Sequence, residues 1–177
     1  MIRPERPEDY EQIDELITRS FKVNGKTPPE VELVNNLRHS ANYIPELCLV
    51  SEVEGQLVGH IFYSKLEIEN NPKHQRFVAL APVCVLPEQQ KRGIGSALIR
   101  KSIEIAVNLN YSAIVVVGHE SYYPKFGFEP LNKYAIKIPF DVPPQNAMIL
   151  RLKCNDQDTA IQCHGMLHYD PVFFLGN

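Results

Sequence analysis

The stretch that decides the fold is Gln90-Lys91-Arg92-Gly93-Ile94-Gly95-Ser96, which follows an apolar run and opens an amphipathic segment. Its glycines let the backbone approach a ligand closely. The first amides of a helix have no partner inside the helix, and the helix dipole favours an anion beside them. Lys91 and Arg92 add positive charge. The loop therefore predicts a binding site for a phosphate or pyrophosphate.

Three phosphate loops compete for this pattern. The P-loop signature G-x-x-x-x-G-K-[ST] is absent. The dinucleotide fingerprint G-x-G-x-x-G/A would need a small residue where Leu98 stands, and a leucine obstructs close packing of helix on strand. An acyl-CoA loop, Q/R-x-x-G-x-G/A, is satisfied by Gln90, Gly93 and Gly95. A plain strand–helix turn, with glycines for geometry alone, stays open as the alternative.

The flanking segments predict a parallel pair of strands joined by a helix. Residues Phe77 to Leu86 form a strand-like run that Pro87 stops, and Ser112 to Gly118 contain a β-branched run typical of a central strand. The helix between them is expected over Gly93 to Asn108, because apolar residues recur on one side of it. That side holds Ile94, Ala97, Leu98, Ile105 and Leu109. Such a crossover is right-handed and makes the two strands parallel.

The rest of the chain predicts shorter elements around this unit. A strand at Ile2–Pro4 precedes a helix with Asp9 as its N-cap, and a second helix starts at Pro28-Pro29. Further elements are expected as a hairpin of Glu46 to Val53 with Leu57 to Ile68, a turn or short helix at Tyr122 to Phe126, and strands at Tyr134 to Ile138 and Ala147 to Leu152. The fold class is therefore α+β, or α/β in looser schemes, with a mixed, mostly antiparallel sheet in one domain, residues 1–177.

Composition narrows the function classes. The chain has 177 residues, of which 44% are hydrophobic and 22% charged, and these values are typical of a globular protein. Its net charge of -3 disfavours a nucleic-acid or anionic membrane partner. The four cysteines form no C-x-x-C pair and the histidines no H-E-x-x-H motif, so no metal is predicted. With no signal peptide and no apolar run of about 20 residues, we expect a cytoplasmic protein with free thiols.

Two motifs resemble those of a known family. Leu80 to Glu88, followed by Gln90 and by Gly93 to Ile99, looks like the central motif of GNAT (GCN5-related) N-acetyltransferases. Tyr122 to Phe128 resembles the downstream F/Y-Y-x-x-hydrophobic-G-F motif of the same family. Both occur in the expected order and spacing. The whole sequence, including Gly118-His119-Glu120, is similar to the YhbS-like branch.

The resemblance implies the GNAT fold and a coenzyme site. In that fold the parallel strands splay apart, and pantetheine lies in the gap. The backbone of Val83, Cys84 and Val85 is then expected to contact pantetheine and the acyl carbonyl, and residues Gln90 to Ser96 to hold the pyrophosphate through N–H groups. A strand amide near Val83 or Val85 would stabilise the oxyanion that develops in the transition state.

The resemblance also implies catalytic roles. Tyr123 matches the tyrosine that often serves as general acid in the family, and a phenol stays protonated at neutral pH. His119 is expected as either the base or a coenzyme contact, with Glu120, Glu88 and a water chain as alternatives. Cys84 is expected to be a small buried residue rather than a nucleophile, which favours direct transfer in a ternary complex.

The predicted activity is transfer of an acetyl group from acetyl-CoA, the cosubstrate, to a primary amine. The alternative from another class is a non-catalytic module that binds CoA or acyl-CoA as a sensor. The expected partner is a small-molecule or peptide amine, without nucleic acid or membrane and with a homodimer left open. The segments expected to shape the acceptor pocket, Phe21 to Ser40 and Pro139 to Gln145, carry no recognition code.

Overall fold

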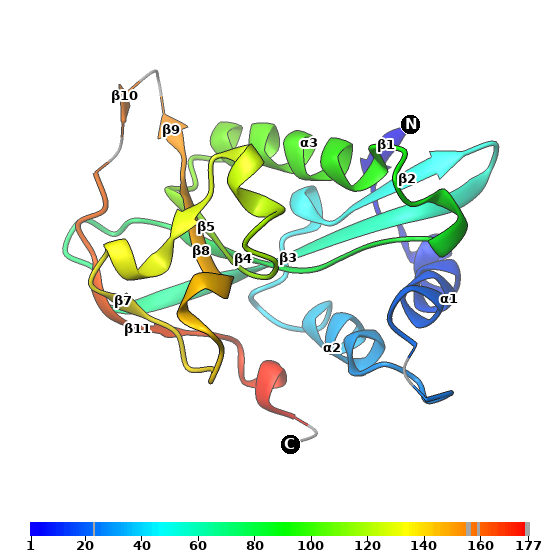
Figure 1. The fold of residues 1–177 in the computed structure, drawn as a ribbon, viewed down its shortest axis with the longest axis horizontal. Helices are drawn as coiled ribbons and strands as arrows, with labels where there is room; N and C mark the ends of the chain where they lie inside the picture. Colours follow the sequence, from blue (N-terminus) through cyan, green and yellow to red (C-terminus); the bar gives the residue numbers. More distant parts are fainter. Residues whose placement is uncertain (23, 155–156, 159, 176–177) are drawn as a thin grey trace. The chain divides into compact units, whose positions relative to one another are not determined.

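The structure is a computed structural model that describes residues 1–22, 24–154, 157–158 and 160–175 (Figure 1). Its α-helices are α1 (Tyr10–Phe21), α2 (Pro29–Leu37) and α3 (Ile94–Asn108). Its strands are β1 (Ile2–Pro4), β2 (Leu49–Val53), β3 (Gln56–Asn70), β4 (Phe77–Val85), β5 (Ala113–Val117), β6 (Glu129–Pro130), β7 (Ile136–Lys137), β8 (Ala147–Arg151), β9 (Lys153–Cys154), β10 (Gln157–Asp158) and β11 (His164–His168). Short 3₁₀ turns include η2 (Pro45–Leu47), η3 (Pro87–Gln89), η4 (Tyr123–Phe126) and η7 (Pro171–Phe174).

Nine of these strands form one mixed sheet in the order β1-β2-β3-β4-β5-β8-β6, with β11 paired to β3 and β7. The β4–β5 and β7–β11 pairs are parallel, and the other pairs with a described register are antiparallel. The predicted fold class and the parallel β4–β5 pair are thus confirmed. The contacts divide the chain into two compact units: a first unit of Met1–Tyr63, Pro82–Ile105 and the residues from Pro171 on, and a second of Ser64–Ala81 and Ala106–Asp170. The single-domain assignment stays a prediction.

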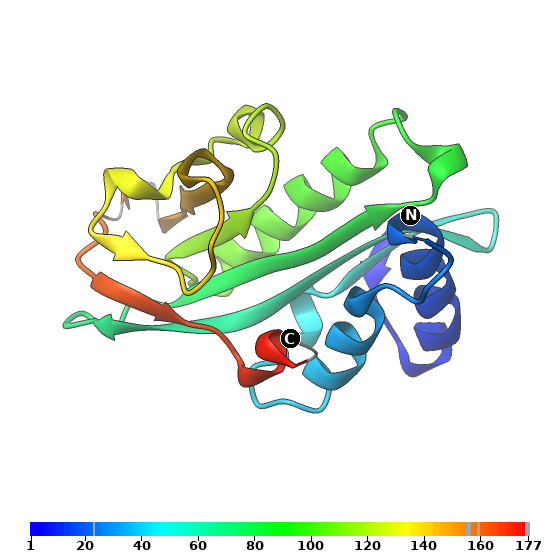
Figure 2. The same ribbon diagram turned by 60° about the horizontal axis from the view of Figure 1, so that its bottom comes forward.

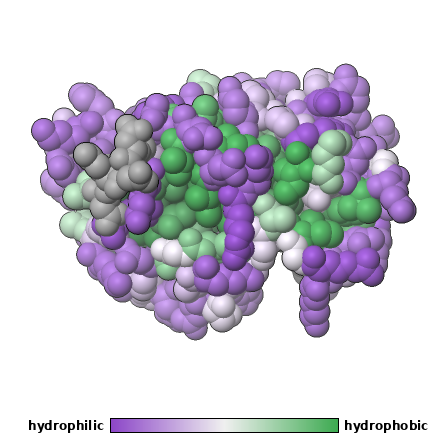
Figure 3. All heavy atoms as spheres, turned by 90° about the horizontal axis from the view of Figure 1, so that it is seen from above, coloured by the Kyte–Doolittle hydropathy of each residue, from purple (hydrophilic) through white to green (hydrophobic). Residues whose placement is uncertain are grey.

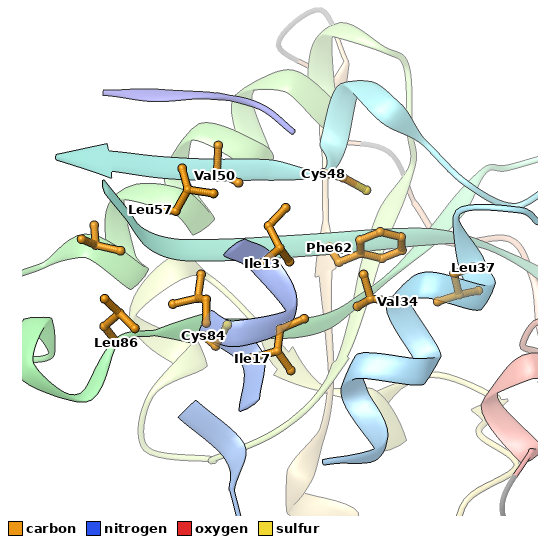
Figure 4. Packing of buried hydrophobic residues seen from close by; sticks show 12 residues of the cluster. Ile13, Ile17, Val34, Leu37, Cys48, Val50, Leu57, Phe62, Cys84 and Leu86 are labelled. Atoms are coloured by element: carbon orange, nitrogen blue, oxygen red, sulfur yellow. The ribbon is translucent and has the colours of Figure 1, made fainter. Parts of the chain in front are cut away.

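The first unit is held together by an apolar cluster under α1 and α2. Helix α1 buries Ile13, Leu16 and Ile17, whose helical spacing places them on one face. They pack with residues of α2, β2, β3 and β4, and Figure 4 shows these side chains converging. The β2–β3 hairpin turns at Glu54 and Gly55, both with positive φ, as a tight hairpin turn requires.

A buried carboxylate ties the N-terminal segment to this unit. Glu5 accepts hydrogen bonds from Arg38 at 2.9 and 3.0 Å, from the Tyr43 hydroxyl at 2.8 Å and from His60 Nε2 at 2.8 Å. Burial alone raises the pKa of Glu5, but the bonds from His60 and Arg38 outweigh it and lower the pKa to about 2. Burial keeps His60 neutral by lowering its pKa, so the charge pair is Glu5 with Arg38.

Helix α3 packs on β3 through a close contact at Gly59. A Cβ at Gly59 would lie 2.9 Å from Ile94 Cγ2 and from Leu98 Cδ1, so any larger residue would have to push these side chains aside. The strand thus supplies the space that Leu98 takes up. The predicted buried face of α3 was partly wrong, because Ala97 is exposed. The residues that are buried are Leu98, Ile99, Ser102 and Ala106, and Ser102 satisfies its hydroxyl on Tyr63 at 2.7 Å.

The second unit surrounds β5. Its residues Ala113–Val117 pair with β8 over Ala147–Arg151, and both strands are buried over most of their length. The cluster includes Phe77 and Ala79 of β4 and Leu167 of β11. The continuous β-branched run therefore forms a central strand, as predicted.

Several predicted boundaries need correction. The first hairpin strand begins at Leu49 rather than Glu46, because Pro45 starts the 3₁₀ turn η2. The strand predicted at Tyr134 to Ile138 shrinks to β7, two residues long. Asp9 occupies the N-cap position of α1, but its side chain accepts the Arg6 N–H at 2.8 Å and pairs with Arg3 instead of capping α1.

Apolar side chains reach the surface in patches bordered by hydrophilic ones on the face drawn in Figure 3. Such exposure is ordinary for a folded chain. Among the described helices, none combines the length and apolar character that crossing a bilayer requires.

Candidate functional site

The site begins where strand β4 extends beyond the end of its parallel partner, β5. In the described residues the ladder with β5 ends at Leu80↔Val116, whereas β4 continues to Val85. Side chains alternate over this extension, with Cys84 buried and Val83 and Val85 half-buried. Main-chain groups on the extension that lack a ladder partner can bond a ligand.

The Cys84 side chain points into the apolar cluster of the first unit, beside Ile13 and Ile17 of α1 (Figure 4). Burial raises the pKa of its thiol to about 12, against a smaller opposing effect of a Ser20 hydrogen bond. A thiol with that pKa is not a thiolate at neutral pH and is a poor nucleophile. The expectation that Cys84 is a small buried residue is therefore confirmed.

The loop after β4 is fixed by its own side chains. Gln90 Nε2 donates to Val85 O at 3.3 Å, and Arg92 donates to Gln89 Oε1 at 3.2 Å. Glu88 is bound by both carboxylate oxygens to Arg19 at 2.8 Å. Lys91, Arg92 and Gly93 are exposed.

Six successive amides, those of residues 91–96, donate to no backbone carbonyl in the part of the chain that the structure describes. The first such bond of α3 runs from Ala97 N–H to Gly93 O at 3.0 Å. Positive φ at Lys91 (63°) and Gly93 (80°) curls the backbone, and a Cβ on Gly93 would meet nothing within 4 Å. Free amides ahead of a helix, with open space before them, fit a pyrophosphate.

The Tyr123 ring packs against Gly118 in the second unit. A Cβ on Gly118 would lie 3.2 Å from Tyr123 Cδ2, 3.3 Å from Cζ and closer still to Cε2. The ring also meets Tyr122 and Phe128 edge-on, with centroids 5.1 and 5.6 Å away. Burial raises the pKa of Tyr123 to about 12. Its hydroxyl makes no hydrogen bond to a described residue, so a protonated phenol is available to a ligand.

The predicted bases differ in their surroundings. His119 is exposed, and its carbonyl accepts the N–H groups of Tyr122 and Tyr123 at 3.1 and 3.4 Å. Glu120 is exposed as well. A hydrogen bond from its own backbone and the ion pair with Arg19 lower the pKa of Glu88, which weakens it as a base.

The predicted residues therefore fall into two groups. The first unit brings together residues 83–85 and 90–96, and the second brings His119 and Tyr123 together. Sequence reasoning missed Gly118 as the residue against which the Tyr123 ring packs. A glycine directly after a buried β-branched strand is a signal of close approach and could have found it. Among the described residues, no group of three or more His, Cys, Asp or Glu side chains is arranged to hold a metal.

Comparison with known proteins agrees with this geometry. The model of the Acetyltransferase (GNAT) family matches residues 10–128. The uncharacterized N-acetyltransferase YjhQ of Escherichia coli K12 is 32% identical over 139 residues, which are 78% of this chain and 75% of the relative. The uncharacterized N-acetyltransferase YhbS of the same organism is 28% identical over 129 residues, 73% of each chain.

Solved structures share the fold. A GNAT family acetyltransferase from Brucella melitensis, in complex with acetyl-CoA, superimposes with a TM-score of 0.75 at 28% identity, covering 98% of this chain and 97% of that one. E. coli YhbS, in complex with CoA, gives a TM-score of 0.83 at 24% identity, covering 100% and 93%. The predicted resemblance, including the YhbS-like branch, is confirmed.

Proposed function

Because this chain belongs to the Acetyltransferase (GNAT) family, we propose that it transfers an acetyl group from acetyl-CoA to a primary amine, by direct attack within a ternary complex. The observation that carries the proposal is the row of free amides at residues 91–96, with Gly93 open in front of it. The buried Cys84 thiol supports direct transfer over a covalent route.

The first unit binds the coenzyme in this proposal. The amides of residues 91–96 hold the pyrophosphate, and the exposed Lys91 and Arg92 add charge. The backbone of Val83, Cys84 and Val85 orients the pantetheine arm and the acyl carbonyl. One amide near Val83 or Val85 stabilises the oxyanion, and such a donor is worth about 3–4 kcal/mol.

Tyr123 is the general acid in this proposal. Acetyl-CoA supplies an acetyl thioester, from which a thiolate leaves as the amide bond forms. A phenol whose pKa is raised to about 12 is fully protonated at neutral pH and can donate to that sulfur. Its hydroxyl has no competing partner among the described residues, which supports the role.

The amine must lose a proton before it attacks, since a lysine-like ammonium has a pKa of about 10.4. We propose His119 as the base, with Glu120 as the alternative, because both are exposed and next to the tyrosines. We also propose that residues 1–177 act as one acetyltransferase domain. Free thiols at Cys48, Cys84 and Cys163 support a location in the reducing cytoplasm.

The test compares two glycines with nearly the same positive φ. Gly93 (φ +80°) and Gly55 (φ +79°) both face open space, so a valine imposes similar backbone strain at either site. We expect Gly93→Val to lose acetyl-CoA binding, measured by calorimetry and by thermal shift, while Gly55→Val keeps it. Equal affinity in the two variants would make the loop a structural turn only.

Turnover separates the enzyme from the sensor module. Thiol release from acetyl-CoA, measured with a panel of primary amines, should require the amine. Binding of acetyl-CoA without thiol release for any amine would favour the non-catalytic alternative.

A further inference from the structure

The last turn of α1 contacts the segment where β4 ends and the glycine loop begins. Arg19 Nη2 donates to both carboxylate oxygens of Glu88 in η3 at 2.8 Å. The Ser20 hydroxyl reaches Val85 O, at the end of β4, at 3.2 Å. In Figures 1 and 2 the green turn that follows β4 lies at the same end of the ribbon as α1. Two consecutive helix residues thus bind partners that lie 69 and 65 positions later in the chain.

The peptide unit between Val85 and Leu86 is held from both sides. Its carbonyl accepts from Ser20 and also from Gln90 Nε2 at 3.3 Å. Its N–H donates to Val58 O on β3 at 2.9 Å. A planar peptide unit that is bonded at both ends has a fixed orientation. Because the N–H and C=O of one strand residue point to the same edge, these bonds also direct the Val85 N–H, one of the proposed oxyanion donors.

The ion pair acts on the turn that follows. Glu88 lies three residues before Lys91, where the backbone takes a positive φ and the loop begins to curl. The side chains of Arg19 and Glu88 are 42% and 48% exposed, so their pair adds little to the stability of the fold. A guanidinium bound to two carboxylate oxygens nevertheless fixes the direction of both groups. The pair therefore holds η3, and with it the start of the loop, against α1.

We infer that Arg19 and Ser20 are positioning residues for the coenzyme, because they hold the end of β4 and the turn η3 in the conformation in which the amides of residues 91–96 bind the pyrophosphate. The inference rests on the proposed coenzyme site and adds two residues of α1 that act on it through Glu88 and Val85. A loop that is ordered before the ligand arrives loses less conformational entropy on binding.

Charge and position predict opposite effects at Glu88. A carboxylate beside the proposed pyrophosphate site repels an anion, so if charge alone acted, Glu88→Gln would strengthen coenzyme binding. Positioning predicts that the same change weakens binding, because it releases η3 from Arg19. The sign of the change in affinity therefore separates the two explanations.

The decisive variant combines Arg19→Gln with Glu88→Gln, which keeps the net charge and removes the ion pair. Since an exposed ion pair is worth a factor of about two to five, acetyl-CoA affinity of the full chain should fall by that factor in calorimetry. The Tm should change by less than about 4 °C. Lys101→Gln with Glu104→Gln is the matched control, because it removes an exposed ion pair of α3 in the same unit, and it should keep wild-type affinity. Wild-type affinity in the decisive variant, or stronger binding in Glu88→Gln alone, would overturn the inference.

A second measurement needs no ligand. Lys91 and Arg92 are exposed and offer trypsin two cleavage sites inside the loop. Cleavage there follows the population of open loop, so the variant without the Arg19–Glu88 pair should be cut about two to five times faster than wild type. The control variant should be cut at the wild-type rate. Equal rates in all three proteins would overturn the inference.

Ser20→Ala tests the end of the strand, with Thr18→Val as its matched control. Both hydroxyls bond a carbonyl four residues earlier at 2.7 Å, but among the described residues only that of Ser20 also reaches β4. A neutral hydrogen bond is worth a factor of about two to ten, so Ser20→Ala should lower acetyl-CoA affinity by that factor and Thr18→Val should not. Equal affinity in the two variants would overturn the role of Ser20. Wild type that binds no acetyl-CoA would overturn the proposed function as well, whereas wild-type binding with unaffected variants would overturn this inference alone.

Discussion

Replacing Gly118 with alanine should displace the proposed catalytic tyrosine. The Gly118 backbone is outside the left-handed region, so alanine meets no backbone strain there. If the Tyr123 ring were absent, the change would stabilise the folded chain by about 0.4–1 kcal/mol, because alanine restricts the unfolded state more than glycine does. The added methyl instead lies 3.2 and 3.3 Å from two atoms of the Tyr123 ring and closer to a third.

The size of the effect follows from that overlap. Carbon atoms pack best at about 3.5–4.0 Å, so the ring must withdraw by roughly 1 Å. Tyr122 and Phe128 meet the ring edge-on and resist this movement. Overpacking of this kind costs about 1–3 kcal/mol, and each kcal/mol lowers the Tm of a chain this long by about 2–4 °C. Turnover should fall by about 10²-fold, since a displacement of about 1 Å can cost that much.

A double-mutant cycle separates the overlap from other effects. Tm, acetyl-CoA affinity and saturating turnover are measured for Gly118→Ala alone and in a Tyr123→Ala background. The alanine should destabilise only the chain that keeps the ring, and should be neutral or stabilising without it. The same loss of stability in both backgrounds would refute the reasoning, because the cost would then not come from Tyr123.

Three further outcomes are expected. Tyr123→Phe should lower saturating turnover by about 10²–10⁴-fold with little change in acetyl-CoA affinity by calorimetry, and unchanged turnover would remove the acid role. Cys84→Ala should keep turnover and lose about 1 kcal/mol of stability, and a thiol reagent should label Cys84 only after unfolding; loss of turnover would reinstate a covalent route. The pKa of Glu5 is lowered from 4.5 to about 2 by His60 and Arg38 against the effect of burial, so its stabilisation is complete above pH 4.5 and is lost as the pH falls toward 2. Glu5→Gln should lower the free energy of unfolding by about 3–5 kcal/mol at pH 7 and reduce the loss of stability at acidic pH, both measured by denaturant titration. An unchanged loss of stability between pH 4.5 and 2 would contradict the assignment.

Local signals were enough to predict the centre of the fold. The apolar run predicts β4, the glycine loop after it predicts the start of α3, and the β-branched run predicts β5. The parallel pairing of β4 with β5 is confirmed. These segments are long and strongly patterned, so local preference and tertiary packing agree. The free amides of Ile94, Gly95 and Ser96 also follow from sequence, because the first turn of a helix leaves its amides without partners inside the helix.

Elements that depend on distant partners were missed. Strand β11 was not predicted, because it has too little pattern to be recognised without its parallel partner β7, which was predicted only as part of a longer strand. The turn η7 gains its structure by packing on α2, far away in sequence. Gly118 was read only as the end of a strand, because the need for a glycine there is visible only when the Tyr123 ring packs against it. Sequence patterns report on residues that are neighbours along the chain, and not on residues that become neighbours only in the folded structure.

The contact between η7 and α2 has a consequence for how the protein is made. Val172 and Phe173 pack against the same cluster as Val34 and Leu37, about 135 positions earlier in the chain. At about 5–20 residues per second, a ribosome adds the later residues on the order of ten seconds after the earlier ones. Until then the first unit lacks two apolar side chains that cover its core. Nascent chains should therefore keep this core partly open until Val172 and Phe173 have been added and have left the ribosome, and a chaperone that binds exposed apolar surface would be released only then.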